Sequence, residues 1–308
     1  MVLDPQVRAL LEDVARLNLP PTHTLSPKEA RDYMRARPVE SGPEVAAAEN
    51  RTIVGPGGPI PIRMYRPFDT GLLPALLWFH GGGMVLGDLD RADATARHLC
   101  IRSGCVVVSV DYRLAPEHKF PAAPNDCYAA TKWAAENANS LQIDQNRIAV
   151  GGDSAGGNLA AVVALMARDM AGPTLVHQLL VYPMSDYNFD TKSYLENADD
   201  YSLTRDTMKW FWDHYLAKEQ DATNPYAAPL RASNLEDLPP ALVITAEYDP
   251  LRDEGEAYAK RLEAASIQTT CSRYEGVIHG FFGMPSMIDK GNVAITQAAE
   301  ALKSAFAR

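Results

Sequence analysis

From about residue 75 onward, short apolar segments alternate with segments of helical periodicity. This alternation constrains the fold more than any other feature of the 308-residue chain. Short, nearly continuous apolar runs are typical of strands buried on both faces, and strands that alternate with helices form a mostly parallel α/β sheet. The predicted strands cover residues 75–79, 105–110, 147–150, 178–182, 241–245 and 269–274. The predicted helices cover residues 92–103, 124–137, 155–170, 250–265 and 293–306.

The chain opens with helical segments and changes to strands before the alternating region begins. Apolar residues at helical spacing over residues 7–17 predict a first helix. The sequence Ser-Pro-Lys-Glu at residues 26–29 has the pattern of a capping box with proline at the first helical position. It predicts a second helix that ends before Pro38. Residues 51–54 and 60–66 then predict two strands joined by a turn rich in glycine and proline.

One segment interrupts the alternation, because far more chain than a crossover needs separates the predicted strands at residues 178–182 and 241–245. It contains an aromatic helix at residues 204–216. We interpret it as an insertion that forms a cap with the N-terminal helices. Ordinary crossover helices packed against the sheet are the alternative. The resulting division assigns residues 1–45 to cap helices, 46–184 to the first part of the α/β core, 185–235 to the cap insertion and 236–308 to the second part of the core.

Charge and composition argue against several classes of function. The formal net charge of −10 disfavours a nucleic-acid surface, which needs basic patches, and disfavours affinity for anionic membranes. The longest aliphatic run, residues 159–167, is too short to span a bilayer, and residues 1–19 lack the apolar core of a signal peptide. The four cysteines have no Cys-x-x-Cys spacing, so we expect free thiols, no bound metal and a cytoplasmic location.

Ser154 is the candidate nucleophile. It is the central residue of Gly-Asp-Ser-Ala-Gly at residues 152–156, which closely follows the predicted strand at 147–150 and precedes a predicted helix. A serine on such a sharp turn projects its hydroxyl beyond the end of the sheet, and the N–H groups of the following helix face a developing oxyanion. The pentapeptide alone is a weak signal, but the strand before it and the helix after it favour a nucleophile elbow.

Acyl transfer by a serine also needs a base and an acid that orients it. In α/β hydrolases the order along the chain is serine, acid, histidine, and three histidines come after the serine. His177 is predicted at the start of a strand, which is the wrong end of the sheet, and His214 lies on the aromatic helix. We therefore expect the base to be His279, in the loop after the last predicted strand.

Asp249 is the expected acid, because it follows the predicted strand at 241–245 by a short loop. Its neighbour Pro250 also gives it the pattern of a helix N-cap with a first-turn proline, and that structural role alone explains the residue. Glu247 and Asp253 are the competing carboxylates. Asp253 falls in the first turn of the predicted helix, where it complements the helix dipole, so we favour Asp249.

The sequence His80-Gly81-Gly82-Gly83 follows the predicted strand at 75–79. Three glycines let backbone N–H groups approach a tetrahedral oxyanion without obstruction by side chains, and the pattern is that of an esterase oxyanion loop. A flexible turn or a phosphate loop is the alternative. A common phosphate loop needs Gly-Lys-Ser/Thr, which this segment does not have.

Five segments together resemble the hormone-sensitive-lipase-like family of α/β-hydrolase esterases, in its bacterial carboxylesterase branch. They span most of the chain from about residue 75 to residue 282, and their joint occurrence in this order is highly specific. The segments are His80-Gly81-Gly82-Gly83, Asp111-Tyr112-Arg113-Leu114-Ala115-Pro116-Glu117, Gly152-Asp153-Ser154-Ala155-Gly156-Gly157, Asp249-Pro250-Leu251-Arg252-Asp253 and His279-Gly280-Phe281.

The resemblance implies an α/β-hydrolase fold, with a mostly parallel eight-stranded sheet, helices on both faces and a helical cap. It implies a serine hydrolase that cleaves carboxylic esters, usually with short acyl chains, without a metal or other cofactor. Carried onto this sequence, the family's triad is Ser154, Asp249 and His279. The motif at residues 111–117 is expected to have a structural role.

The resemblance also implies where the oxyanion is bound. The donors fall mainly on the N–H groups of Gly82, Gly83 and Ala155. Gly81 shapes the same loop and is a further candidate donor in the oxyanion hole. Met84 stands where the family commonly has an aromatic residue, and we expect this departure to alter the pocket near the acyl group.

Several alternatives stay open at this point. The same apparatus serves an amidase or a lactonase, which sequence barely separates from an esterase of small-molecule substrates. The family resembles certain plant hormone receptors that keep the pocket without the triad histidine, and His279 argues against that function. An interfacial lipase is disfavoured because the sequence has no separate apolar lid. The oligomeric state is open, and some relatives form a homodimer through the segments that correspond to residues 269–274 and 293–306.

Overall fold

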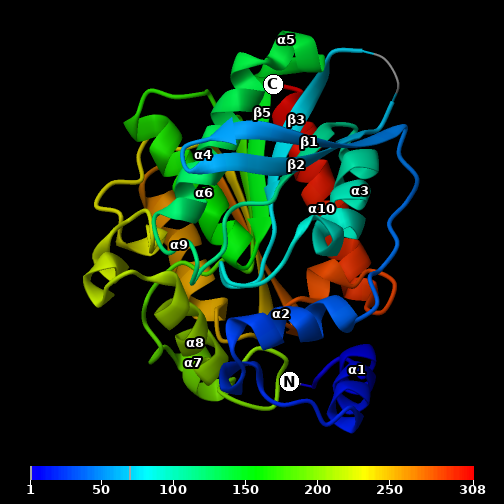
Figure 1. Ribbon diagram of the computed structural model, residues 1–308, viewed down its shortest axis with the longest axis vertical. Coiled ribbons are helices and arrows are strands. Elements are labelled where there is room, and N and C mark those ends of the chain that lie inside the picture. Colours follow the sequence, from blue (N-terminus) through cyan, green and yellow to red (C-terminus); the bar gives the residue numbers. More distant parts are fainter. Residues whose placement is uncertain (1, 69–70) are drawn as a thin grey trace.

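The computed structural model describes residues 2–68 and 71–308, which build one eight-stranded sheet between two layers of helices (Figure 1). The strand order is β1-β2-β4-β3-β5-β6-β7-β8. β2 is antiparallel to β1 and to β4, whereas β3 to β8 are parallel, so the sheet is mostly parallel as predicted. The strands are β1 (Ala47–Gly55), β2 (Gly58–Arg66), β3 (Leu73–Phe79), β4 (Val106–Val110), β5 (Ile143–Asp153), β6 (His177–Val181), β7 (Ala241–Tyr248) and β8 (Thr269–Ile278).

Helices cover both faces of the sheet, which explains why its central strands are apolar throughout. Successive residues of β3 enter different hydrophobic clusters: Leu76 and Trp78 pack with α3 and α10, whereas Leu77 and Phe79 pack with α4, α6 and α9. Both faces of these strands are therefore removed from water. The covering helices are α3 (Leu89–Ser103) and α10 (Asp289–Phe306) on one face, and α4 (Ala122–Glu136), α6 (Ala155–Asp169) and α9 (Arg252–Ala264) on the other.

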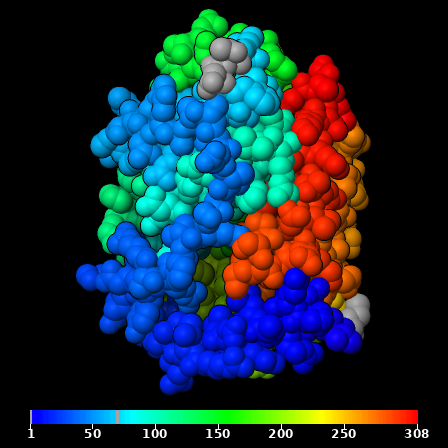
Figure 2. All heavy atoms as spheres, turned by 90° about the vertical axis from the view of Figure 1, so that its right-hand side faces the viewer, coloured from blue at the N-terminus to red at the C-terminus, as the bar shows by residue number. Residues whose placement is uncertain are grey.

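Four further helices lie together at one end of the sheet, the lower part of Figure 1. The indole N–H of Trp210 donates to the carbonyl oxygen of Leu25 at 3.1 Å, which joins two segments that are far apart in sequence. In the space-filling view, the dark blue N-terminal segment closes this end of the molecule (Figure 2). The four helices are α1 (Pro5–Arg16), α2 (Pro27–Ala36), α7 (Lys192–Glu196) and α8 (Arg205–Tyr215).

Some elements differ from the predicted bounds. β1 begins at Ala47, before the predicted residue 51, because its pairing with β2 continues through exposed residues that lack an apolar pattern. α10 begins at Asp289, before the predicted residue 293, since Gly291 stays helical. A Cβ on Gly291 would lie 2.4 Å from the carbonyl oxygen of Phe281, a close approach that only glycine permits. The short helices α5 (Ala138–Leu141) and α7 were not predicted, because so few residues carry no periodicity.

Within the part of the chain that the structure describes, none of the helices combines the length and the apolar character needed to cross a membrane. All four cysteines are unpaired, as expected. Three of them are buried, and Cys271 on β8 is exposed.

Candidate active site

Ser154 lies on the turn between β5 and α6, where the strand meets the helix. Its backbone has φ 57° and ψ −117°, a sparsely populated conformation that matches the strained turn of a nucleophile elbow. Gly156 allows the helix to approach β3 closely, because a Cβ there would lie 1.8 Å from the carbonyl oxygen of Phe79. Ser154 is 8% exposed, and it lines a cavity at this end of the sheet.

His279 follows β8 and contacts both other members of the expected triad. Its Nε2 lies 3.0 Å from Oγ of Ser154, and its Nδ1 lies 2.7 Å from Oδ2 of Asp249. The Asp249 side chain is fully buried, whereas the His279 side chain is 13% exposed. The ring of Tyr182 packs against the imidazole with ring centroids 4.5 Å apart. Three residues that are distant in sequence are therefore joined by one chain of hydrogen bonds.

The two carboxylate oxygens of Asp249 have different partners. Oδ2 bonds to His279, while Oδ1 accepts the N–H of Leu251 at 2.9 Å. α9 begins later than predicted, at Arg252, so Asp249 caps the turn that leads into the helix. The capping role and the contact with the histidine therefore coexist in one side chain.

The competing carboxylates bind elsewhere. Oε2 of Glu247 accepts the N–H of Gly276 at 2.7 Å. Asp253 accepts the N–H of Ser193 at 2.7 Å. Among the described residues, the side-chain hydrogen bonds of His279 run to Ser154 and Asp249, and neither competitor takes part.

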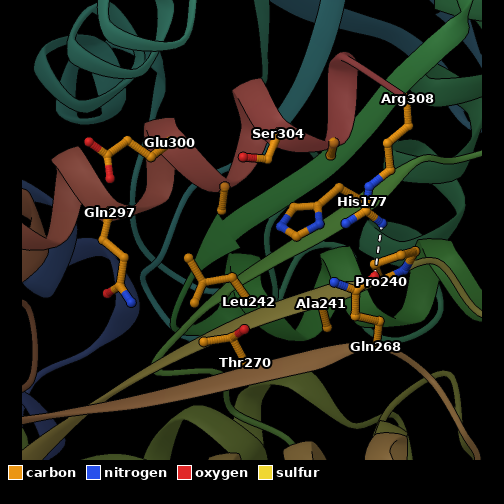
Figure 3. A pocket seen from close by; sticks show the side chains of 12 residues that line it. His177, Pro240, Ala241, Leu242, Gln268, Thr270, Gln297, Glu300, Ser304 and Arg308 are labelled. Atoms are coloured by element: carbon orange, nitrogen blue, oxygen red, sulfur yellow. Dashed lines mark hydrogen bonds between the residues drawn. The ribbon is translucent and has the colours of Figure 1, made fainter.

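The two other histidines that follow the serine lie away from it. His177 is the first residue of β6, at the amino end of the sheet, and lines a separate cavity of about 400 Å³ beneath α10 (Figure 3). Burial, with a smaller effect from Arg308, lowers the pKa of His177 to about 4. His214 on α8 packs edge-on against Trp210, with ring centroids 4.5 Å apart. None of the three expected triad residues lines the His177 cavity.

The glycine loop after β3 lines the same cavity as Ser154. Gly82 and Gly83 have positive φ angles of 113° and 62°. A Cβ on Gly83 would lie 2.1 Å from the ring of Phe211 on α8, so this position needs glycine for conformation and for space. Ala155 is the first residue of α6, where a backbone N–H has no partner within the helix.

Two contacts fix the start of the glycine loop. The N–H of Gly81 donates to Oδ1 of Asp153 at 3.1 Å, and burial raises the pKa of that carboxyl to about 6. The Tyr112 hydroxyl donates to the carbonyl oxygen of His80 at 2.7 Å, and the two rings stack with centroids 4.4 Å apart. The sequence did not predict that Asp153 and Tyr112 hold this loop.

The cavity beside Ser154 has a volume of about 360 Å³ and is lined in part by the cap. α8 contributes Phe211, and α2 contributes Met34. The side chain of Met84 is fully buried in the hydrophobic core and is not among the described residues that line the cavity, so an effect on the pocket would act through packing and stays a prediction. The carbonyl oxygen of Met84 accepts the N–H of Ala115 at 2.8 Å, and this backbone bond helps to hold the glycine loop in place.

The segment at residues 111–117 makes two ion pairs. The guanidinium of Arg113 binds both carboxylate oxygens of Asp126, at 2.8 and 2.7 Å, and the Asp126 side chain is fully buried. Glu117 pairs with Arg31 of α2 at 2.7 Å, and this bond lowers the pKa of Glu117 to about 2. The segment thus ties the cap helix α2 to the sheet.

A mostly parallel sheet with a serine on a strand-to-helix turn, bonded to a histidine and an aspartate that follow later strands, defines the class of α/β hydrolases. A family model described as the alpha/beta hydrolase fold matches residues 76–283. Esterase LipI of Mycobacterium tuberculosis is 42% identical to this chain, over 98% of it and 94% of LipI. Ethyl acetate hydrolase of Pseudomonas putida is 38% identical, over 80% of this chain and 79% of its own length.

The solved structure of another esterase is also similar to this chain. The hyperthermophilic esterase from the archaeon Pyrobaculum calidifontis is 46% identical, with a TM-score of 0.92 and 99% of both chains covered. The chain belongs to the hormone-sensitive-lipase-like family of α/β-hydrolase esterases, as its motifs indicate.

Proposed function

We propose that this chain is a serine carboxylesterase that hydrolyses small carboxylic esters through an acyl-enzyme. One observation carries the proposal: the hydrogen-bonded chain from Oγ of Ser154, through both nitrogens of His279, to the buried carboxylate of Asp249. The relatives named above are esterases, which supports the same activity.

In the first step, Oγ of Ser154 bonds to the ester carbonyl carbon while Nε2 of His279 takes the hydroxyl proton. Nδ1 donates to Asp249 over 2.7 Å, and this bond holds the imidazole in the tautomer with a free lone pair on Nε2. The same carboxylate stabilises the imidazolium that forms. The electron pair of the carbonyl bond moves to oxygen and creates the oxyanion.

We assign the oxyanion to the N–H groups of Gly82, Gly83 and Ala155, which belong to the two segments beside the nucleophile. The Gly81 N–H donates to Asp153, so we assign Gly81 to the shape of the loop. Donors that are fixed before the reaction stabilise the developing charge without reorganisation, and loss of one typically lowers kcat by about 10²–10³.

Collapse of this intermediate breaks the bond between the carbonyl carbon and the leaving oxygen. His279 gives its proton to that oxygen, so an alcohol leaves and the acyl group stays on Ser154. Water then attacks the acyl carbon and passes a proton to His279. When the second intermediate collapses, the proton returns to Oγ and the carboxylic acid leaves.

We propose acyl chains of short to medium length as substrates. The cavity of about 360 Å³ lies at the low end of the range for small-molecule sites, and Phe211 from the cap lines it in contact with Gly83 of the glycine loop. The relative from Pseudomonas putida is named for ethyl acetate, an ester with a short acyl chain.

Hydrolysis of a p-nitrophenyl ester series, from acetyl to palmitoyl, tests the proposal. We expect a short-chain optimum in the unmodified protein and almost no turnover in Ser154→Ala. Ser140→Ala is the control, since that exposed serine lies on α5, remote from the cavity. A Ser154→Ala variant that keeps most of its activity refutes the assignment, and faster cleavage of a matched anilide or lactone makes the enzyme an amidase or lactonase.

We propose the division into residues 1–45, 46–184, 185–235 and 236–308, of which residues 1 and 69–70 lie outside the described part. This division is supported by α1, α2, α7 and α8, which fall within the two cap ranges.

We propose a cytoplasmic location, supported by the unpaired cysteines. We propose a homodimer through β8, an edge strand, and α10, which sedimentation tests directly.

A further inference from the structure

The cap insertion contacts the loop that carries Asp249. Ser193 of α7 is fully buried, and its hydroxyl donates to the carbonyl oxygen of Pro250 at 2.6 Å. Asn197, one residue beyond α7 and 3% exposed, donates from Nδ2 to the carbonyl oxygen of Asp249 at 3.3 Å. The same amide donates to the carbonyl oxygen of Ser193 at 3.1 Å, so the two side chains form one unit.

The contact between α7 and this loop is reciprocal. The N–H of Ser193 donates to Oδ2 of Asp253 at 2.7 Å, and the N–H of Asp253 donates to Oγ of Ser193 at 3.2 Å. On the outer side, the Arg252 guanidinium donates to Glu196 at 3.1 Å. Ser193 thus uses its hydroxyl as donor and as acceptor towards the loop at residues 249–253, and it also contacts the Thr191 hydroxyl within the insertion at 3.2 Å.

The loop at residues 249–253 needs such support because of its composition. Pro250 has no N–H and cannot donate a backbone hydrogen bond. α9 begins only at Arg252, so the carbonyl group of Pro250 precedes the helix and is met by the Ser193 hydroxyl. The backbone path of this loop decides where the Asp249 carboxylate stands relative to His279, to which it bonds at 2.7 Å.

We propose that Ser193 and Asn197 are positioning residues for Asp249, so that the cap insertion holds the triad acid in place through α7. The inference rests on the proposed role of Asp249. The insertion also reaches the base, since the hydroxyl of Ser202 donates to the carbonyl oxygen of His279 at 3.2 Å. The cap therefore serves the geometry of the triad as well as the enclosure of substrate.

Ser193→Ala and Asn197→Ala test this inference. We expect kcat on p-nitrophenyl butyrate to fall about 10- to 100-fold, because a displacement of about 1 Å at a reacting group has an effect of this size. KM should change little, because neither residue is among the described lining of the cavity. Ser103→Ala is the matched control: that serine is also buried and also donates to a carbonyl oxygen at 2.6 Å, but on α3.

Two readouts separate positioning from a loss of stability. In an Asp249→Asn background, Ser193→Ala should cause no further loss of kcat, since the group through which it acts is gone. In proton NMR spectra, the downfield resonance of the His279 Nδ1 proton, which the bond to Asp249 produces, should weaken or shift in Ser193→Ala and persist in Ser103→Ala.

Each outcome decides the question. A kcat for Ser193→Ala and Asn197→Ala equal to that of Ser103→Ala, or the full loss repeated in the Asp249→Asn background, overturns the positioning role. Asn197→Ala provides the same test if Ser193→Ala does not fold. An Asp249→Asn variant with unchanged kcat refutes the triad assignment instead, so the two failures are distinguishable.

Discussion

Replacement of Asp249 by asparagine changes one heavy atom of the proposed triad, and the surrounding bonds predict which way the new amide turns. Oδ1 of Asp249 accepts the N–H of Leu251 at 2.9 Å. The amide oxygen keeps this bond in the variant, because an NH2 group cannot accept it. The NH2 group then occupies the position that faces Nδ1 of His279.

This orientation reverses the protonation of the imidazole. Nδ1 must accept from the new NH2 group, so the single proton of the neutral ring moves to Nε2. Nε2 faces Oγ of Ser154 at 3.0 Å and can no longer take its proton. Loss of the general base through the wrong imidazole tautomer lowers kcat by about 10⁴ in a serine triad. At about 1.36 kcal/mol for each factor of ten, the barrier rises by about 5.4 kcal/mol.

Initial rates with saturating p-nitrophenyl butyrate measure the effect, and circular dichroism confirms that the variant folds. Glu247→Gln is the matched control, because that buried carboxylate accepts a backbone N–H and has no bond to His279 among the described residues. We expect its kcat to stay close to the unmodified value. An Asp249→Asn variant within about tenfold of the unmodified enzyme would refute the tautomer argument, since that corresponds to only about 1.4 kcal/mol.

Three other substitutions have defined outcomes. Gly83→Ala places a methyl group 2.1 Å from the Phe211 ring, so the loop must shift and kcat should fall by about 10²–10³ without loss of fold. Arg113→Ala leaves the buried Asp126 without its ion-pair partner and should lower the free energy of unfolding in urea by about 3–5 kcal/mol; a change below about 1 kcal/mol contradicts the structural role. The pKa of Asp153 is raised to about 6 in the folded chain, so the folded state binds more protons than the unfolded state between pH 3.8 and about 6. Relative to Asp153→Asn, the unmodified protein should therefore lose stability as pH rises through that window, which paired thermal melts detect.

Much of the fold follows from the sequence because most of its strands are buried on both faces. β4 consists of five residues that are all buried, and such a run stands out against polar turns. β1 carries a weaker signal, since six of its nine residues are exposed and one, Ile53, is buried, and its true start came only from its pairing with β2. The start of α10 escaped prediction because glycine at 291 normally disfavours a helix, and its close approach to another segment is a tertiary property.

The triad assignment rests on chain order and on strand ends, which the sequence supplies. Parallel strands bring their carboxyl ends together, so residues placed after different strands were expected to meet at one edge. The supports of the site depend on contacts between distant segments and have no local pattern. Tyr182 against His279, and the Ser193 hydroxyl on Pro250, are of this kind. No periodicity or spacing in the chain points to either contact.

β6 and β7 lie side by side in register, although residues 182–240 separate them along the chain. The entropy lost when a loop closes grows only with the logarithm of its length, by about 0.6 kcal/mol for each doubling. A crossover of about a dozen residues that is lengthened roughly fivefold therefore adds about 1.4 kcal/mol. Evolution can enlarge or reshape this insertion, and with it the substrate pocket, at little thermodynamic cost. Sequence change in the insertion is restricted in one short stretch around α7. A replacement segment there must still offer hydrogen-bond donors to the carbonyl groups of Asp249 and Pro250.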